Sequence, residues 1–254
     1  MVTLRSIFLM CFICLPSQAD TLSLENDVFQ LGTSVRLLLL KYYHVQADEG
    51  NGELVMTLQQ GVRQSEQQHQ AIQQQLSARY LTQSHNIAQH WQRFNQHLHV
   101  NLQEIQENAF PELQVVTLMR NAANDMVTEL DKLGQLLQQQ EGLTISASRN
   151  WSRQQQRVLL QVVERYIERA ASSMGAPLSV DGPDLPQLLQ TFEQGLQAYP
   201  EASASAQARQ QLNKVRSQWL FIARSARNQQ ARMVPYLVMR YTDNILSRLD
   251  QLAS

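Results

Sequence analysis

Asn26–Val45, with the sequence NDVFQLGTSVRLLLLKYYHV, is the stretch that decides the fold, and it predicts a long helix. Its apolar residues recur every three or four positions, at Val28, Leu31, Val35, Leu38, Tyr42 and Val45. This spacing is typical of the seam of a helical bundle. The leucines at 37–40 make the helix apolar on all sides, so a second face must also be covered by protein. That second face carries a cation, Arg36, within an apolar stripe.

A later helix, Ser148–Ala170, repeats the features of the first one. Its sequence, SRNWSRQQQRVLLQVVERYIERA, places Arg157 where the first helix has Arg36. Three further pairs follow in the same order along the chain: Glu66 and Glu193, Trp91 and Trp219, and Asp131 and Asp250. The residue numbers of the four pairs differ by 121, 127, 128 and 119. Matching helices joined by loops of unequal length predict two copies of one four-helix unit.

The predicted fold class is therefore all-α, with two up-and-down four-helix bundles in tandem. We place the first bundle at residues 20–142 and the second at 143–254, and no segment shows the alternating pattern of a strand. At 254 residues the chain is long enough to bury a core in either bundle. A single fused assembly of eight helices is the alternative.

The composition excludes some classes of partner. The formal net charge is -1, which gives no electrostatic footprint for nucleic acid or for an anionic membrane surface. Glutamine accounts for 38 residues, many of them between the apolar repeats. Because glutamine is a good helix former, we interpret these residues as solvated helix faces.

Residues 1–19 have the pattern of a signal peptide that is cleaved after Ala19. Arg5 supplies the positive charge, residues 7–15 are apolar, and residues 17–19 form a small-x-small cleavage site. Both cysteines, Cys11 and Cys14, lie inside this segment, so the mature chain is expected to have no thiol chemistry. No later segment approaches the length of a transmembrane helix. We therefore expect an exported, soluble protein of a bacterial periplasm.

Catalytic and metal-binding patterns are missing from the sequence. We find no nucleophile with its base, no paired acid and base, and no phosphate-binding loop, so we expect neither enzymatic activity nor a cofactor. His90 and His97 share a helix face, but two turns separate them by about 10 Å, too far for one metal ion. His69 occupies a seam position that is typical of a hydrogen-bonded core histidine.

The first helix resembles the signature of a known sensory family. Residues 31–37, LGTSVRL, followed by Lys41, Tyr42 and Tyr43, resemble the motif of the PilJ/NarX-type sensory domain. That domain is the periplasmic four-helix module of type IV pilus chemotaxis transducers and of nitrate/nitrite sensor kinases. Arg36 and Lys41 match its two basic positions. The resemblance extends over nearly the whole mature chain, in two copies, through residues 156–159, 184–199 and 212–219.

The resemblance implies a binding site for a small anion. In the nitrate sensors the motif arginines of two subunits meet at the dimer interface and hold one anion, and a planar guanidinium suits a planar oxyanion. The resemblance thus implies that Arg36 and Arg157 meet within one chain, with Lys41 nearby. The alternative for each arginine is a packed stem whose head reaches solvent or a glutamate.

Two functional hypotheses follow. In the first, the chain is an exported module that binds a small solute, such as nitrate or nitrite, and acts through a membrane partner. In the second, it is a structural or interaction protein of the cell envelope that docks through the apolar second face of its first helix. The paired arginines favour the first hypothesis. The second is favoured by Gly32, one position too far from Arg36 for the family motif, and by Val162, where the second basic residue belongs. A homodimer is left open.

Overall fold

The computed structural model describes residues 18–172, 183–199, 204–228 and 232–253. Within these ranges the chain forms eight α-helices and no strand, which confirms the predicted all-α class. The first four helices are α1 (Gln18–Ala47), α2 (Gly52–Gln75), α3 (Leu81–Asn108) and α4 (Leu113–Gln140), with a short 3-10 helix, η1 (Ala78–Tyr80), before α3. The other four are α5 (Ala147–Ala171), α6 (Leu185–Gln197), α7 (Ala206–Arg227) and α8 (Pro235–Leu252).

The predicted leader falls almost entirely outside the described residues. Only Gln18 and Ala19 of the segment 1–19 are described, and they belong to α1, which begins eight residues before Asn26. None of the helices in the described ranges combines the length and the apolar character that crossing a membrane requires.

Local side-chain chemistry sets several helix boundaries. The side chains of Asn51, Ser146, Asp184 and Ser205 accept hydrogen bonds from backbone N–H groups in the first turns of α2, α5, α6 and α7. These groups have no partner within the helix, so each cap stabilises a helix start. Pro235 begins α8, at a position where its missing N–H costs nothing.

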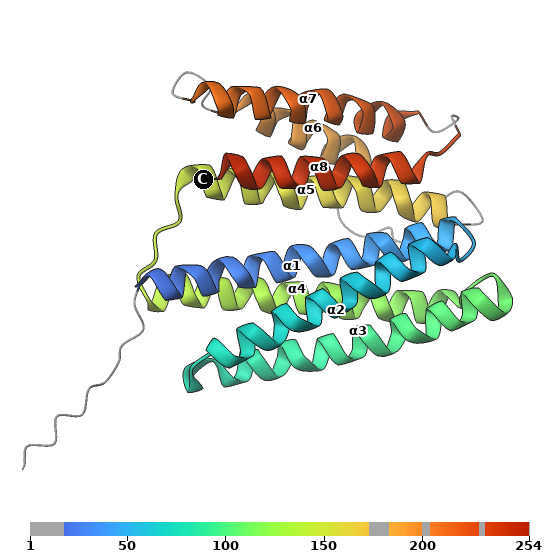
Figure 1. Ribbon diagram of the computed structural model, residues 1–254, viewed down its shortest axis with the longest axis horizontal. Helices are drawn as coiled ribbons and strands as arrows, with labels where there is room; N and C mark the ends of the chain where they lie inside the picture. Colours follow the sequence, from blue (N-terminus) through green and yellow to red (C-terminus); the bar gives the residue numbers. More distant parts are fainter. Residues whose placement is uncertain (1–17, 173–182, 200–203, 229–231, 254) are drawn as a thin grey trace, which may run out of the picture.

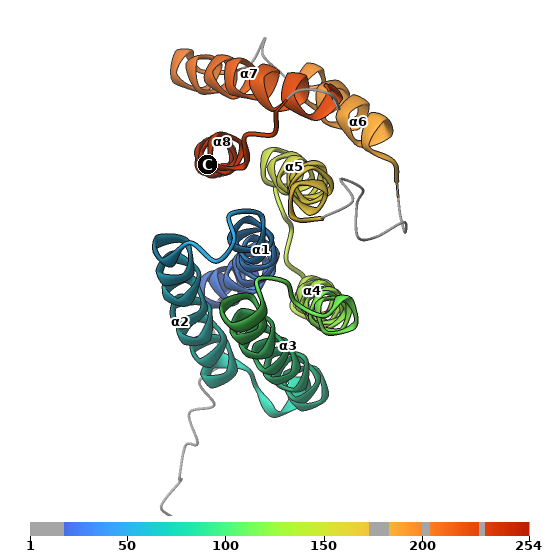
Figure 2. The ribbon, with the colours of Figure 1, turned by 90° about the vertical axis from the view of Figure 1, so that its right-hand side faces the viewer.

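The helices form two antiparallel groups that meet through their first members. Figure 1 shows α1–α4 below and α5–α8 above, each group running up and down. Seen along the helix axes, α1 and α5 lie next to one another in the middle of the molecule (Figure 2). These two lead helices run parallel, and α1 also packs against α2, α4 and α8.

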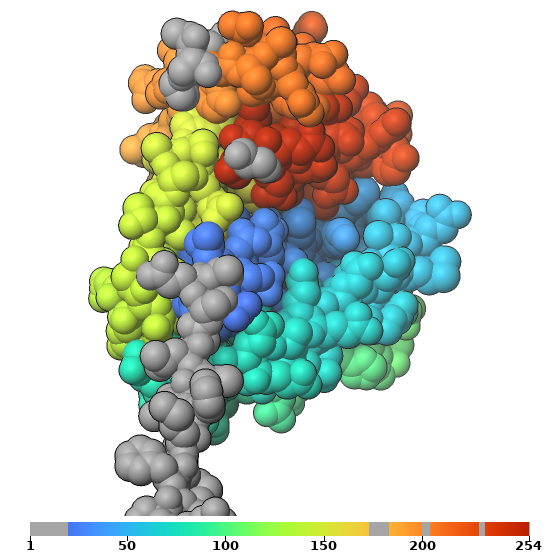
Figure 3. All heavy atoms as spheres, turned by 60° about the vertical axis from the view of Figure 1, so that its left-hand side comes forward, coloured from blue at the N-terminus to red at the C-terminus, as the bar shows by residue number. Residues whose placement is uncertain are grey.

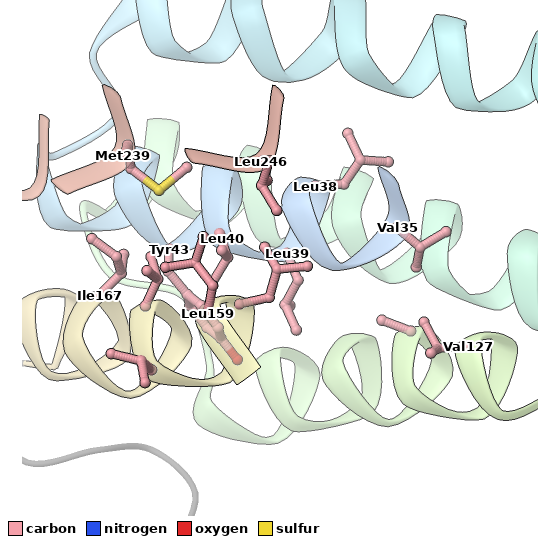
Figure 4. Packing of buried hydrophobic residues seen from close by; sticks show 14 of the residues in the cluster. Val35, Leu38, Leu39, Leu40, Tyr43, Val127, Leu159, Ile167, Met239 and Leu246 are labelled. Carbon is pink, nitrogen blue, oxygen red and sulfur yellow. The ribbon is translucent and has the colours of Figure 1, made fainter. Parts of the chain in front are cut away.

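The second face of α1 is covered at Leu40 and Tyr43, which are almost completely buried, as is the neighbouring Leu39. Figure 4 shows these side chains among residues of α5 and α8, which include Leu159 and Met239. Arg36, on the same face, is partly buried. The buried apolar side chains of both groups belong to one cluster. The face through which the second hypothesis would dock a partner is therefore occupied by the chain itself. The division into two four-helix repeats at residues 20–142 and 143–254 stays a prediction.

A tryptophan–glutamate hydrogen bond occurs once in each group. The indole N–H of Trp91 in α3 donates to Glu66 in α2, and that of Trp219 in α7 donates to Glu193 in α6 at 3.3 Å. Both tryptophans are buried. The same contact at matching positions supports the internal repeat.

The two lead helices, α1 and α5, are not aligned in the way that pairing Arg36 with Arg157 would require. Arg153 of α5 contacts Glu25 of α1, 128 positions away, and this spacing equals that between Trp91 and Trp219. The pairing of Arg36 with Arg157 uses a spacing of 121, a difference of seven residues or two helical turns. The residue that lies 128 positions after Arg36 is Glu164.

Candidate functional site

A buried ion pair joins the two lead helices near their N-terminal ends. Arg153 donates from Nη1 to Oε1 of Glu25 at 2.6 Å and from Nη2 to Oε2 at 2.8 Å. Both residues are buried, with exposed fractions of 6% and 2%. Gln138 of α4 also donates to Oε1 of Glu25, at 2.8 Å. Two parallel charge-assisted bonds in a dry environment fix the position of the guanidinium.

Phe29 of α1 lies against two arginines of α5. The guanidinium carbon of Arg153 is 4.5 Å from the centre of its ring, and that of Arg157 is 5.4 Å away. Arginines four residues apart lie on the same face of a helix, so one aromatic ring can contact both. Guanidinium groups at such distances are attracted to the face of the ring.

Arg157 has a second partner, on α4. Its Nη2 lies 2.6 Å from Oδ1 of Asp131. The two side chains are 48% and 40% exposed, so solvent screens their attraction. Exposed ion pairs of this kind contribute between 0 and about 1 kcal/mol. This pair can therefore open at little cost, whereas the Arg153–Glu25 pair is held by its burial.

These side chains line a polar cavity of about 190 Å³ between α1, α4 and α5, which we call the lead-helix cavity. Its walls include Phe29, Asp131, Gln135, Asn150, Arg153 and Arg157. At this end of the molecule the start of α1 (blue) and the start of α5 (yellow-green) lie side by side at the surface (Figure 3). The Nε of Arg153 is buried, and no atom of the described residues forms a hydrogen bond with it. The cavity thus combines one anchored guanidinium with one that can be released.

A second hollow, of about 420 Å³, also has Phe29 and Arg153 in its walls. It lies toward α8, where Asp250 accepts hydrogen bonds from Gln156 at 2.7 Å and from Gln30 at 3.3 Å. Asp250 is the counterpart of Asp131 in the internal repeat. Its carboxylate thus accepts hydrogen bonds from side-chain amides of both lead helices.

Arg36 lies in another charged cluster, farther along the same pair of helices. Glu164 of α5 is partly buried, and burial raises the pKa of its carboxyl while Arg36, Arg165 and Arg120 oppose the rise. The neighbouring Glu168 is fully buried and lies 3.8 Å from both Arg120 and Arg165. Three cations therefore face two carboxylates in this cluster.

The structure does not bring Arg36 and Arg157 together. Arg157 lies beside Phe29, and Phe29 and Arg36 are seven residues apart on α1, about 10 Å along the helix. Arg157 pairs with a carboxylate, and Arg36 lies near one, which is the arrangement that the packed-stem alternative describes. The anion site between these two arginines that the resemblance implies is not formed.

Lys41 lies apart from both arginines, in a cleft between α1, α2 and α8. Asp243 of α8 shares this cleft. Partial desolvation raises the pKa of its carboxyl, and the charge of Lys41 opposes the rise. The three basic residues singled out in the sequence therefore occupy three separate places.

The sequence reasoning missed Arg153, Glu25 and Asp131 as members of a site. Arg153 precedes Arg157 by one helical turn, and this i, i+4 spacing marks a common face. Trp91 and Trp219 are 128 residues apart in the sequence. The same spacing, counted from Glu25 in the first lead helix, leads to Arg153 in the second. The arginine pair that shares a cavity is thus Arg153 and Arg157.

No group of three or more histidine, cysteine, aspartate or glutamate side chains is placed to hold a metal ion within the described ranges. Compared with protein-family models, with curated proteins and with solved structures, the chain shows no significant match.

Proposed function

We propose that the chain is a binding module that holds a small solute with an oxyanion group, such as nitrate, nitrite or a small carboxylate, in the lead-helix cavity. The observation that carries this proposal is the pair of arginines in its wall. Among the described residues, Arg153 is buried with an unused N–H at Nε, and the carboxylate that pairs with Arg157 is an exposed one. A planar oxyanion matches the fork of donors that a guanidinium presents.

The anion replaces Asp131 as the partner of Arg157. Because the Arg157–Asp131 pair is nearly half exposed, its opening costs about 1 kcal/mol at most, and Asp131 can turn to solvent. The amides of Gln135 and Asn150 lie in the same cavity and supply further donors. A volume of about 190 Å³ is below the range of drug-sized ligand pockets, which favours a solute of few atoms.

As part of the same proposal, the chain is related to the PilJ/NarX-type sensory domain. It is exported to the periplasm, where a membrane partner receives its signal. The parallel contact of α1 and α5 supports it, because a tandem pair that imitates a sensor dimer brings its two lead helices together. The ligand then sits where the two halves meet, and its binding can change their contact.

Thermal unfolding of the purified protein against nitrate, nitrite, acetate and glycine tests the proposal. A ligand at 100 times its Kd adds about 2.7 kcal/mol, a shift of roughly 2–4 °C for a chain of this size. Arg157→Ala should abolish the shift. Asp131→Asn should enlarge it at a fixed subsaturating ligand concentration, since it removes the competing carboxylate.

Arg63→Ala is the matched control, because Arg63 is an exposed arginine on α2 outside the cavity. It should leave the shift unchanged. No shift with any member of the panel, or a shift that survives Arg157→Ala, would contradict the proposal.

A further inference from the structure

A second cleft, of about 380 Å³, opens near the end of the molecule where α1 ends and α2 and α8 begin (Figure 1). We call it the α1–α2–α8 cleft. Its walls include Lys41, Leu54, Tyr236, Met239, Arg240 and Asp243. Helices of both halves contribute to it, and clefts between structural units are preferred places for ligands. Its volume lies within the range of small-molecule sites.

The positive charges in the wall of this cleft outnumber the negative ones. Lys41 is partly buried and Arg240 is exposed, and neither has a hydrogen bond or ion pair from its side chain within the described part of the chain. Asp243 acts on Lys41 only at longer range. His44, also in the wall, is 8% exposed, and burial lowers its pKa, so it is neutral at pH 7. Two cations and one carboxylate leave one positive charge without a counter-ion.

Apolar side chains make up the rest of the wall. Met239 is buried and Leu54 is partly buried, while Tyr236 is 62% exposed. The exposed Tyr236 lies beside an apolar wall and two cations. Such a surface is suited to a ligand whose apolar part covers the ring.

We propose that the α1–α2–α8 cleft binds an amphipathic monoanion, a molecule with an apolar chain and a terminal carboxylate. The carboxylate lies between Lys41 and Arg240, and the chain runs over Leu54, Met239 and Tyr236. The site is separate from the lead-helix cavity, and it stands or falls independently of the function proposed there.

Calorimetric titration of the purified protein with octanoate tests the inference, with octylammonium and acetate as probes that lack the correct charge or the apolar chain. Octanoate should bind, and the other two should not. Lys41→Ala combined with Arg240→Ala should weaken octanoate binding by about tenfold or more, because it removes both cations that hold the carboxylate. Asp243→Asn should strengthen it, since it removes the opposing carboxylate.

Arg209→Ala combined with Lys214→Ala is the matched control, because it removes one arginine and one lysine from the exposed surface of α7. This variant and Arg157→Ala should both bind octanoate as the wild type does. The inference is overturned if octanoate gives no binding heat, if octylammonium binds equally well, or if the Lys41/Arg240 variant retains full affinity while its circular dichroism shows it folded.

Discussion

Arg153 and Glu25 form a buried, two-pronged ion pair that joins the two halves of the molecule, with N–O distances of 2.6 and 2.8 Å. It sets the register of the lead helices, because sliding either helix by one turn would separate the two charges. The pair also forms one side of the lead-helix cavity. Its geometry therefore links the packing of the fold to the candidate site.

Arg153→Met should lower the free energy of unfolding by about 3–5 kcal/mol, because it leaves the carboxylate of Glu25 buried without its cation. Glu25→Leu should have a similar cost. The double variant should be much more stable than the sum of the single losses predicts, since two apolar side chains then replace both charges. Urea unfolding followed by circular dichroism measures all three. Additive losses in the double variant would show that the pair does not act as a unit.

The hydrogen bond between Trp91 and Glu66 and its counterpart between Trp219 and Glu193 allow the internal repeat to be tested by the same substitutions in both halves. Glu66→Leu removes the acceptor of a buried indole N–H and should cost about 1–3 kcal/mol of stability. Glu66→Gln keeps an acceptor and should cost about 1 kcal/mol or less. In the other half, Glu193→Leu and Glu193→Gln should show the same order, measured by thermal unfolding with tryptophan fluorescence. Equal losses for leucine and glutamine at both positions would argue against the structural equivalence of the two contacts.

The helices and their buried faces could be predicted from the sequence, and the arrangement of the charged residues could not. The apolar residues from Val28 to Val45 recur at a fixed spacing, which determines the face that is buried, and the leucines at 37–40 required a second covered face. Repeated apolar side chains of similar size, however, pack almost equally well after a shift of one or two turns. The register was instead set by polar contacts such as Arg153 with Glu25, whose partners are far apart in the sequence.

The neighbours of Arg36 and Lys41 could not be predicted either, because they also depend on how the helices are aligned. A cation in an apolar stripe signals that a partner lies on a neighbouring helix, but the stripe does not say which residue it is. In the structure Arg36 acts on Glu164 of α5, and Lys41 lies near Asp243 of the last helix. Both carboxylates come from the second half of the chain, so only the relative placement of the halves identifies them.

Acid should destabilise the protein through its two buried histidines. Burial lowers the pKa of His44 and of His69 below the ordinary histidine value of about 6.5. As the pH falls below 6.5, the unfolded chain binds protons that the folded chain does not yet bind, so stability falls until the folded pKa is passed. Each histidine can add a slope of up to about 1.4 kcal/mol per pH unit.

Urea unfolding at pH 7, 6 and 5 measures this loss for the wild type and for His69→Gln, which removes one of the two groups. The variant should lose less stability than the wild type between pH 7 and 5. His85→Gln is the control, since His85 lies in an exposed position on α3 and should leave the slope unaltered. A wild-type slope retained in His69→Gln would exclude this histidine as a source of the acid sensitivity.

The two halves should unfold together. The first helix packs against helices of both halves, and the buried apolar residues form one cluster across the contact. Leu58→Ala in α2 and Leu212→Ala in α7 each empty a fully buried position, at a cost of about 2–5 kcal/mol. In a scanning calorimeter the wild type should show one transition, and each variant should lower the Tm of that same transition. Separate bundles would give two transitions, with Leu58→Ala moving one and Leu212→Ala the other, because a cavity in one bundle would then leave the core of the other intact.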